Sequence, residues 1–393
     1  MSVRLLISAL PGETRAAWVA EGRLRDLVVL RDDRPWIADN IYCGRIQAVD
    51  KGLAGAFVDI GCARPGFLPL GEGPKGLSQG DAVIVRVKRE PGPDKGARLT
   101  ARFGELPPDV AAAAQRARPP ALLRRAADPI VAALGLAEPP AEIVIDDPAA
   151  FAEAKQALGP RPDLLARLKL DLDPAPLFER EGIEEAIEAL LEARAALPSG
   201  GSLLIEPVQS LTAIDVNSAR HGGAAKARAL DVNLEAAAEI PRQLRLRALS
   251  GLIVVDFLEL GEAAARQRVV EELQRGLKDD PAPCRVFPMS ASGLVEMTRR
   301  RSRPALHEIL TEPCGVGGRV KDPVTLAYQA LRAVRRAARG APGHRVSVSA
   351  APGVVAALEG PAKPARAALE GRLGRPIELR AERHRDGFEI VLD

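Results

Sequence analysis

The sequence is poor in the residues that build disulfide frameworks, zinc-protease sites and membrane spans. Its four cysteines, Cys43, Cys62, Cys284 and Cys314, lie far apart and form no C-x-x-C pair, which excludes a disulfide framework. The four histidines stand in no Ser/His/Asp or H-E-x-x-H context, so nucleophilic or zinc-protease chemistry is not expected. No apolar run approaches the roughly 18 residues needed to span a bilayer. These absences predict a cytoplasmic protein without a membrane anchor.

A predominance of one charge and a leader-like segment are also lacking. The 55 Lys+Arg and 52 Asp+Glu residues leave a net charge of +3, so the net charge alone implies no particular partner. Residues 5–10 form an apolar run that ends at Pro11 and Gly12, which predicts a first strand rather than a secretory signal. The chain has 393 residues, 47% hydrophobic and 27% charged, and is expected to form about two to four folded domains.

Aromatic residues make up only 3% of the sequence, yet four of them gather in its first part. Trp36, Tyr42, Phe57 and Phe67 belong to a stretch in which apolar and polar residues alternate between Gly- or Pro-rich breaks. Over 37–102 this pattern predicts five short strands. Five strands in this length fit a small Greek-key barrel of the OB type.

The rest of the chain predicts a mixed organisation of helices and strands. Residues 103–196 are Ala-rich and helical except for a strand over 142–147, and residues 202–217 predict a β-hairpin. The strand at 251–260 is apolar on both faces, as a central strand would be. Further helices are expected at 233–249, 262–278 and 323–339, and further strands at 284–289 and 387–392. The chain is therefore predicted to be a multidomain protein of the α+β or α/β class.

Two aspartates inside apolar strands are the first candidates for chemistry. Asp215 lies in Ala-Ile-Asp-Val-Asn and Asp256 lies in Val-Val-Asp-Phe-Leu. A carboxylate on an inward strand position is costly unless it is paired or binds a metal, and two on neighbouring strands would suit Mg²⁺, which takes few protein carboxylates. Asn217 points to the same side as Asp215 and could orient a ligand carboxylate or phosphate. The alternative is that both aspartates end their strands or form salt bridges to nearby arginines.

The predicted barrel is the second candidate. The rings of Phe57, Phe67 and Tyr42 could present faces on which unpaired bases stack. The cations that would contact a nucleic-acid backbone are Arg45, Arg64, Lys88, Arg89 and Lys95. The alternative is that the aromatics fill the barrel core, and barrels of this type also bind oligosaccharides and proteins.

Basic residues concentrate in sequence around the two aspartates and form the third candidate. They are Arg220, His221, Lys226, Arg228, Arg242, Arg245, Arg247 and the run 299–303. Such clusters attract phosphate backbones, and the attraction weakens as salt rises. The alternative is that they form solvated helix faces.

Several long strings resemble the ribonuclease E/G family. They are Leu-Pro-Ser-Gly-Gly-Ser from 197, Leu-Thr-Ala-Ile-Asp-Val-Asn-Ser-Ala-Arg from 211, Asn-Leu-Glu-Ala-Ala from 233, Arg-Gln-Leu-Arg-Leu-Arg from 242, Gly-Leu-Ile-Val-Val-Asp-Phe from 251 and Gly-Leu-Val-Glu-Met-Thr-Arg from 293. Residues 54–61 and 66–70 resemble the family's RNA-binding barrel. The resemblance implies an endoribonuclease that cuts single-stranded RNA with Mg²⁺, or Mn²⁺ as an alternative, and leaves a 5′-phosphate and a 3′-hydroxyl.

The resemblance also assigns roles to individual residues. Asp215 and Asp256 match the family's metal-binding aspartates, and Asn217 matches the asparagine beside them, so these three are the expected catalytic residues. Together with the positions singled out above, the residues expected to bind RNA are Phe57, Phe67, Lys95, Arg64, Tyr42 and Arg220.

The family architecture implies a division of the chain into five parts. A ribonuclease-H-like subdomain is expected over 1–36 and 103–196, with the OB barrel over 37–102 inserted in it. A deoxyribonuclease-I-like catalytic subdomain would cover 197–310. A linker over 311–322 and a small α/β domain over 323–393 would follow.

Three departures from the family pattern limit this transfer. Arg102 is followed closely by Pro107 and an Ala-rich helix where the family places its sensor of 5′-monophosphates, so dependence on the RNA 5′ end is expected to be lost. The family's zinc-sharing CPxC motif is reduced to Cys314, so zinc binding is not expected and a homodimer would need other contacts. The residues at 291–292 replace an Arg-Phe pair, and Pro241 interrupts an otherwise regular helix.

Two other functions stay open on the sequence. An RNA-binding protein of the same fold with little or no nuclease activity would be consistent with the departures. A protein-interaction or ribosome-associated module would use the barrel face. The nuclease hypothesis is favoured over both, because a pure binding protein has no evident use for two aspartates in apolar strands.

Overall fold

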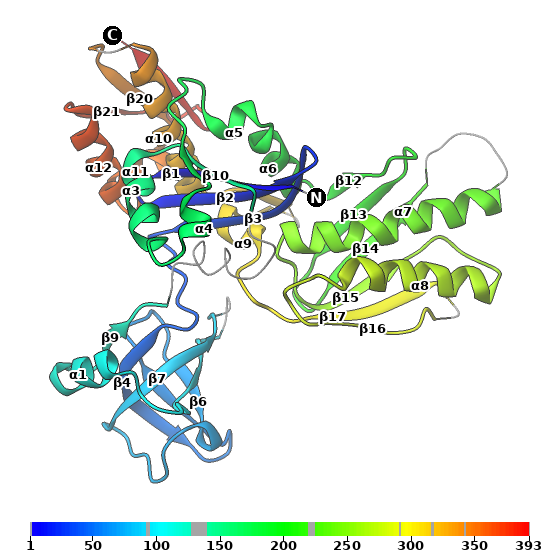
Figure 1. The fold of residues 1–393 in the computed structure, drawn as a ribbon, viewed down its shortest axis with the longest axis horizontal. Coiled ribbons are helices and arrows are strands. Elements are labelled where there is room, and N and C mark those ends of the chain that lie inside the picture. Colours follow the sequence, from blue (N-terminus) through cyan, green and yellow to red (C-terminus); the bar gives the residue numbers. More distant parts are fainter. Residues whose placement is uncertain are drawn as a thin grey trace. The chain divides into compact units, whose positions relative to one another are not determined.

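A computed structural model describes residues 2–91, 95–126, 140–218, 225–290, 292–315, 318–341 and 343–392 (Figure 1). The chain divides into two units, Pro35–Ala133 and the combination of Met1–Arg34 with Leu134–Asp393. Each unit has its own sheets and hydrophobic core. Among the described residues, no helix has the length and apolar character that a membrane crossing requires.

The smaller unit contains a closed β-barrel. Its strands are β4 (Ile41–Asp50), β5 (Gly55–Asp59), β6 (Gly66–Pro69), β7 (Ala82–Arg89) and β8 (Arg98–Thr100). They follow the order β5-β6-β8-β7-β4, and antiparallel pairing of β4 with β5 closes the ring. Alternate side chains such as Ala56, Val58 and Leu68 fill the interior, as the two-residue period of a strand requires. The prediction of a five-stranded OB-like barrel is confirmed.

Three short elements complete the barrel unit. They are the 3₁₀ turn η1 (Leu70–Glu72), helix α1 (Pro108–Arg116) and strand β9 (Ala121–Arg124). Strand β9 pairs antiparallel with β4 and so adds a sixth strand beside the barrel. The finer division of the chain into subdomains stays a prediction.

The larger unit begins with a five-stranded sheet. Its strands are β1 (Val3–Leu10), β2 (Glu13–Ala20), β3 (Arg23–Arg31), β10 (Glu142–Ile145) and β11 (Leu168–Leu170). Strands β1 to β3 form antiparallel hairpins, and β10 runs parallel to both β1 and β11. The helices of this part are α3 (Pro148–Ala157), α4 (Pro162–Leu165), α5 (Leu177–Arg180) and α6 (Ile183–Leu191). Phe178 and Ile187 share a core with Leu6 and Ala17, so α5 and α6 cover one face of the sheet.

A six-stranded sheet with two helices on one face follows. Its strands are β12 (Arg194–Ala196), β13 (Ser202–Pro207), β14 (Thr212–Asn217), β15 (Gly251–Asp256), β16 (Cys284–Val286) and β17 (Leu294–Arg299), in the order β12-β13-β14-β15-β17-β16. Helices α7 (Ala225–Leu246) and α8 (Ala263–Leu277) lie side by side along this sheet (Figure 1) and contribute Leu244 and Leu273 to its core. The predicted hairpin is present as β13 and β14.

The prediction of a central strand is confirmed, since β15 lies inside the sheet order. One of its faces is buried, with Ile253 and Val255, while Leu252 on the other face is 40% exposed. A second expectation about this region was wrong. Pro241 does not interrupt its helix, because α7 runs through it without a break. The ring of Pro241 faces Gly276 of α8, where a Cβ would come within 2.7 Å of the proline Cγ. Proline cannot donate the backbone hydrogen bond of the helix, and the dispersion energy of the close helix packing offsets this loss of stability.

The C-terminal part adds three helices on a small sheet. Helix α9 (Leu306–Leu310) leads into a hairpin of β18 (Thr311–Cys314) and β19 (Gly318–Lys321), and the remaining elements are α10 (Pro323–Gly340), β20 (Val346–Ala350), α11 (Pro352–Glu359), α12 (Lys363–Leu373), β21 (Ile377–Ala381) and β22 (Phe388–Leu392). Strand β20 lies between β21, which is parallel to it, and β22, which is antiparallel. Leu10 of β1 shares a core with Tyr328 and Leu331 of α10, so this layer packs on the first sheet.

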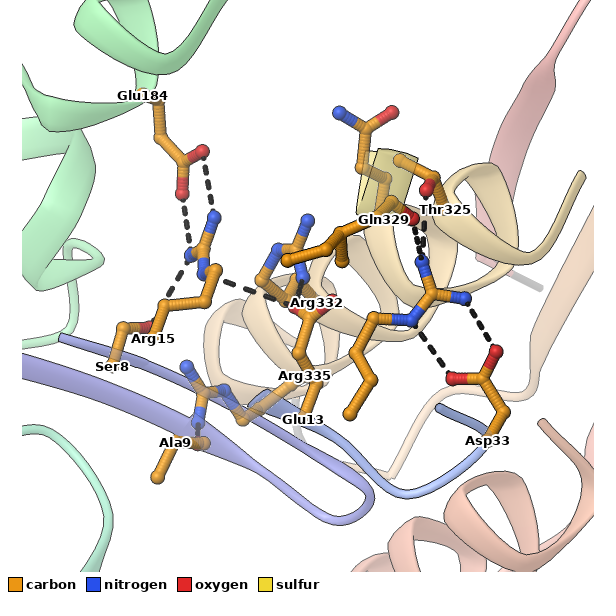
Figure 2. Close-up of polar contacts among 12 residues, drawn as sticks. Ser8, Ala9, Glu13, Arg15, Asp33, Glu184, Thr325, Gln329, Arg332 and Arg335 are labelled. Atoms are coloured by element: carbon orange, nitrogen blue, oxygen red, sulfur yellow. Dashed lines mark hydrogen bonds and ion pairs between the residues drawn. The ribbon is translucent and has the colours of Figure 1, made fainter. Parts of the chain in front are cut away.

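Buried ion pairs reinforce that contact between the first sheet and helix α10 (Figure 2). Arg15 of β2 donates two hydrogen bonds to Glu184 of α6, at 2.7 and 3.0 Å, and Arg332 of α10 pairs with Glu13 of β2. The side chains of Arg15 and Glu13 are only 5% and 3% exposed. We call these four residues the junction network. Because each charge is met by an opposite one, β2, α6 and α10 are held together without an unpaired buried charge.

Candidate functional site

Strand register brings Asp215 and Asp256 together. Strands β14 and β15 are parallel, and Asp215 lies directly opposite Asp256. Neighbouring strands are about 4.8 Å apart, and side chains at the same register position point to the same face. The residues that precede the two aspartates, Ile214 and Val255, are buried in the core under α7 and α8. The two carboxylates therefore lie together on the opposite face, at the carboxyl ends of their strands.

The surroundings of this pair leave the carboxylates accessible. Asp215 is half-buried and Asp256 is exposed. Asn217 donates a hydrogen bond from its Nδ2 to the Oδ2 of Asp215 at 2.7 Å, which fixes the orientation of that carboxylate. Within the described residues, no lysine or arginine forms an ion pair with either aspartate. The salt-bridge alternative raised by the sequence is therefore not supported in this part of the chain.

The possible ligand atoms at the ends of β14 and β15 suit a hard divalent cation. It consists of two carboxylates and one side-chain amide, all of them oxygen-bearing. No group of three or more His, Cys, Asp or Glu side chains among the described residues is placed to hold a metal. Mg²⁺ is commonly held by one or two carboxylates and keeps several waters, so a two-aspartate site fits it better than it fits zinc, which prefers four ligands including His or Cys.

The arginines near the aspartates in sequence are bound elsewhere. Arg242 pairs with Glu239, Arg299 with Asp280, Arg301 with Glu308 and Arg303 with Asp26, whereas Arg245 donates to the Asp279 carbonyl. Arg299 lies opposite Gly251, at the far end of β15 from Asp256. Burial lowers the pKa of Arg247 to about 10, which marks it as a packed residue and not a solvated one. The expectation that these arginines gather beside the aspartates was wrong, because tertiary partners decide where a long side chain points.

Phe57 and Phe67 lie on the outer side of the barrel. They face each other across β5 and β6, with ring centroids 5.7 Å apart in an edge-to-face arrangement. Their strand neighbours Ala56, Val58 and Leu68 are fully buried, whereas both rings are half-buried. A Cβ on Gly55 would come within 2.2 Å of the Phe67 ring, so the glycine makes room for it. The outward rings leave surface on which a base could stack.

The remaining residues expected to bind RNA are placed differently. Tyr42 is buried in the barrel core, receives a hydrogen bond from Asn40, and has its pKa raised by burial, which favours the core alternative for this ring. Lys95 and Arg64 are exposed at the barrel surface. Arg220 lies outside the described residues, as does His221.

Comparison with known proteins decides the family. The model of the ribonuclease E/G family matches residues 78–302, which include both aspartates and Asn217. The chain belongs to the ribonuclease E/G family. Members of this family are endoribonucleases that use a divalent metal.

Individual members of the family support the same assignment. The chain is 32% identical to ribonuclease E of Haemophilus influenzae over 422 residues, covering 84% of this chain and 45% of that protein. It is 32% identical to ribonuclease E of Escherichia coli over 430 residues, covering 85% and 40% of the two chains. The chain thus spans less than half of these two relatives. It is 28% identical to ribonuclease G of Escherichia coli over 495 residues, covering 100% of both chains.

Proposed function

We propose that this chain is a Mg²⁺-dependent endoribonuclease that hydrolyses single-stranded RNA in RNA processing or decay. The observation that carries the proposal is the register of β14 and β15, which places Asp215 beside Asp256 on an accessible face. Family membership supplies the reaction class, hydrolysis of a phosphodiester to a 5′-phosphate and a 3′-hydroxyl. By analogy with the family, β12 to β17 would form a deoxyribonuclease-I-like catalytic subdomain, and the first sheet a ribonuclease-H-like one.

Asp215 and Asp256 would hold the divalent ion, with Mn²⁺ as an alternative to Mg²⁺. When bound, such an ion lowers the pKa of water and stabilises negative charge on a phosphodiester oxygen. Carboxylates on strands about 4.8 Å apart can reach one ion whose bonds to oxygen are about 2.1 Å long. The two aspartates supply the negative charge that makes the site selective for a cation.

Asn217 would act by positioning. Its Nδ2 holds one oxygen of Asp215 at 2.7 Å, so the other oxygen keeps a fixed direction. Supporting hydrogen bonds of this kind orient ligand carboxylates, and their loss typically lowers metal affinity or activity about 10- to 100-fold. Asn217 therefore belongs to the site although it carries no charge.

The barrel would bind the RNA substrate through Phe57 and Phe67, whose outward rings suit stacking with unpaired bases. Lys95 and Arg64 would add contacts to the RNA backbone, as would Arg220. The structure gives Tyr42 a place in the core, so it would contribute by supporting the barrel wall.

Two features would set this chain apart within its family. A reduced sensor region would make cleavage independent of the RNA 5′ end. A single thiol, Cys314, in place of the zinc-sharing pair would mean that a homodimer forms without zinc.

Cleavage of an unstructured RNA oligonucleotide tests the proposal. Wild-type protein is expected to cleave with Mg²⁺ and to stop in EDTA, and D215N and D256N are each expected to lose activity. Glu296→Gln is the matched control, since Glu296 is an exposed acid on strand β17 of the same sheet. Equal cleavage by wild type, D215N and D256N would contradict the catalytic assignment. RNA binding without any metal-dependent product would favour an RNA-binding protein that is not a nuclease.

A further inference from the structure

Four side chains on the outer side of the barrel lie in one continuous row. Phe57 is opposite Phe67 across β5 and β6, Phe67 is opposite Arg98 across β6 and β8, and Arg98 is opposite Arg89 across β8 and β7. We call these four residues the barrel row. With strands about 4.8 Å apart, the row extends over roughly 14 Å. Two aromatic rings at one end are thus followed by two guanidinium groups at the other.

The backbone holds this row in place. The amide of Phe67 donates to the carbonyl of Ala97 at 2.8 Å, immediately before Arg98. A Cβ on Gly66 would come within 2.6 Å of Leu99, so β6 and β8 approach closely there. Leu99 is fully buried whereas Arg98 is exposed. The alternation of β8 therefore directs Arg98 outward, on the same side as the ring of Phe67.

Among the residues that the structure describes, the two arginines of the row have no counter-charge. Neither Arg89 nor Arg98 forms a hydrogen bond or an ion pair with its side chain to any described residue, whereas the neighbouring Lys88 pairs with Glu72 at 3.3 Å. Both arginines are exposed. Like charges directly opposite each other on paired strands are destabilising. An arrangement that places two cations in this position is relieved by a bound anion, and guanidinium groups bind phosphate with two hydrogen bonds.

We propose that the barrel row is a path for single-stranded RNA, in which Arg98 and Arg89 hold phosphates next to bases stacked on Phe57 and Phe67. This inference rests on the proposed RNA substrate. It adds Arg98 to the residues that would hold the RNA, and it places Arg89, already a candidate from the sequence, directly opposite Arg98. Stacking on the rings tolerates any base, and phosphate contacts are equally independent of sequence. The row therefore favours unpaired RNA without selecting its sequence.

The test measures RNA affinity of the full chain at several salt concentrations. A fluorescent, unstructured ribo-oligonucleotide is titrated in EDTA, so that no cleavage occurs, with wild type and with the double variant R89A/R98A. Each phosphate contact on a single strand contributes about 0.7 to the slope of log K against log salt. R89A/R98A is therefore expected to bind roughly 10- to 30-fold more weakly near 0.1 M salt, with a slope shallower by about 1.4.

Two variants serve as controls. R116A/R124A removes two exposed arginines from the same unit, on α1 and β9, and is expected to bind within about threefold of wild type. R89K/R98K keeps both charges and is expected to keep the wild-type slope. The barrel row would be overturned if R89A/R98A bound RNA with the affinity and the salt slope of wild type. It would also be overturned if the salt slope of R89K/R98K equalled that of R89A/R98A.

The barrel row and the nuclease proposal can fail separately. If wild type cleaves RNA with Mg²⁺ and R89A/R98A binds normally, the row is wrong and the nuclease proposal stands. If wild type binds RNA through the row but yields no product with any divalent ion, the row stands and the nuclease proposal is wrong.

Discussion

Two sets of acidic side chains in the larger unit have opposite surroundings. Glu13 and Glu184 of the junction network are met by Arg15 and Arg332 and lie between packed elements (Figure 2). Asp215 and Asp256 lie side by side at the carboxyl ends of two central strands, and no cation of the described residues pairs with them. The negative charges of Glu13 and Glu184 are neutralised by arginines of the protein. The negative charges of Asp215 and Asp256 are not, so they are available to a bound ligand.

The difference shows how the same chemical group acquires a structural or a functional role. Taking a carboxylate out of water is costly unless an opposite charge and hydrogen bonds replace the water. At the junction, arginine supplies both, and removing either partner leaves an unpaired charge. At the ends of β14 and β15, the two neighbouring carboxylates repel each other, and a cation bound between them would relieve that repulsion. The first arrangement should therefore matter for stability, and the second for catalysis and metal binding.

The largest expected effect is the loss of cleavage in D215N and D256N. Each is expected to cleave RNA about a thousand-fold or more slowly than wild type, because several kcal/mol of transition-state stabilisation are lost and each 1.36 kcal/mol is tenfold. Single-turnover cleavage with Mg²⁺ measures it. The free energy of unfolding in EDTA should be unchanged or higher, since a like-charge repulsion is removed. If D215N or D256N lost activity only because it unfolded, the two aspartates would have a structural role like that of the junction network, and the proposed difference would be wrong.

The next effect is on stability at the junction. Glu13→Ala leaves Arg15 and Arg332 without their shared partner, so the free energy of unfolding should fall by about 3–5 kcal/mol. Urea denaturation of the full chain measures it. Glu296→Ala removes an exposed acid and should change stability by no more than about 0.5 kcal/mol. Similar values for the two variants would show that the junction network is not a buried ion pair in solution.

A smaller effect is the pH dependence of the junction. Burial alone would raise the pKa of Glu184, but attraction to Arg15 and its hydrogen bonds outweigh burial and hold that pKa below its usual 4.5. The ionised group therefore stabilises the fold above about pH 4.5, and this contribution is lost as the pH falls from 4.5 through the lower folded pKa. Urea denaturation at pH 7 and at pH 3.5 should show a narrower gap between wild type and Glu184→Gln at the lower pH. A gap independent of pH would rule out this linkage.

The smallest effect is stabilisation of the folded state by a metal ion at Asp215 and Asp256. A ligand at ten times its Kd stabilises the folded state by about 1.4 kcal/mol, so Mg²⁺ should raise the Tm of wild-type protein modestly. D215N/D256N should show no rise, whereas Glu184→Gln should show the full rise because its defect lies at the junction. A rise in D215N/D256N would place the metal elsewhere.

Local patterns in the sequence were enough to predict the barrel and the aspartate strands. The alternation over 37–102 matches the observed strands β4 to β8 because each barrel strand buries every second side chain. Likewise, the apolar residues beside Asp215 and Asp256 predicted two strands. The prediction succeeded because Ile214 and Val255 point into the core of the sheet and are buried there. Strands whose burial follows from the alternation of apolar and polar residues in a short sequence segment were thus predicted correctly.

Features that depend on pairing between distant segments were not predicted. The junction network joins residues such as Arg15 and Glu184 that lie far apart in the chain. The hairpin of β2 and β3 was also missed, although these two strands are neighbours in the sequence. Arg98 was not singled out either, because only the register of β6 with β8 places it beside Phe67. For the same reason the arginines at 242–247 and 299–303 were assigned to the wrong surroundings.

The most direct test of the central claim is a Mn²⁺ titration followed by electron paramagnetic resonance of the free ion. Wild-type protein is expected to bind one ion that D215N/D256N does not bind, and Mg²⁺ is expected to displace it. Glu296→Gln, on the same sheet, should bind like wild type. Equal binding by wild type and D215N/D256N would contradict the account, because the paired aspartates would then hold no metal.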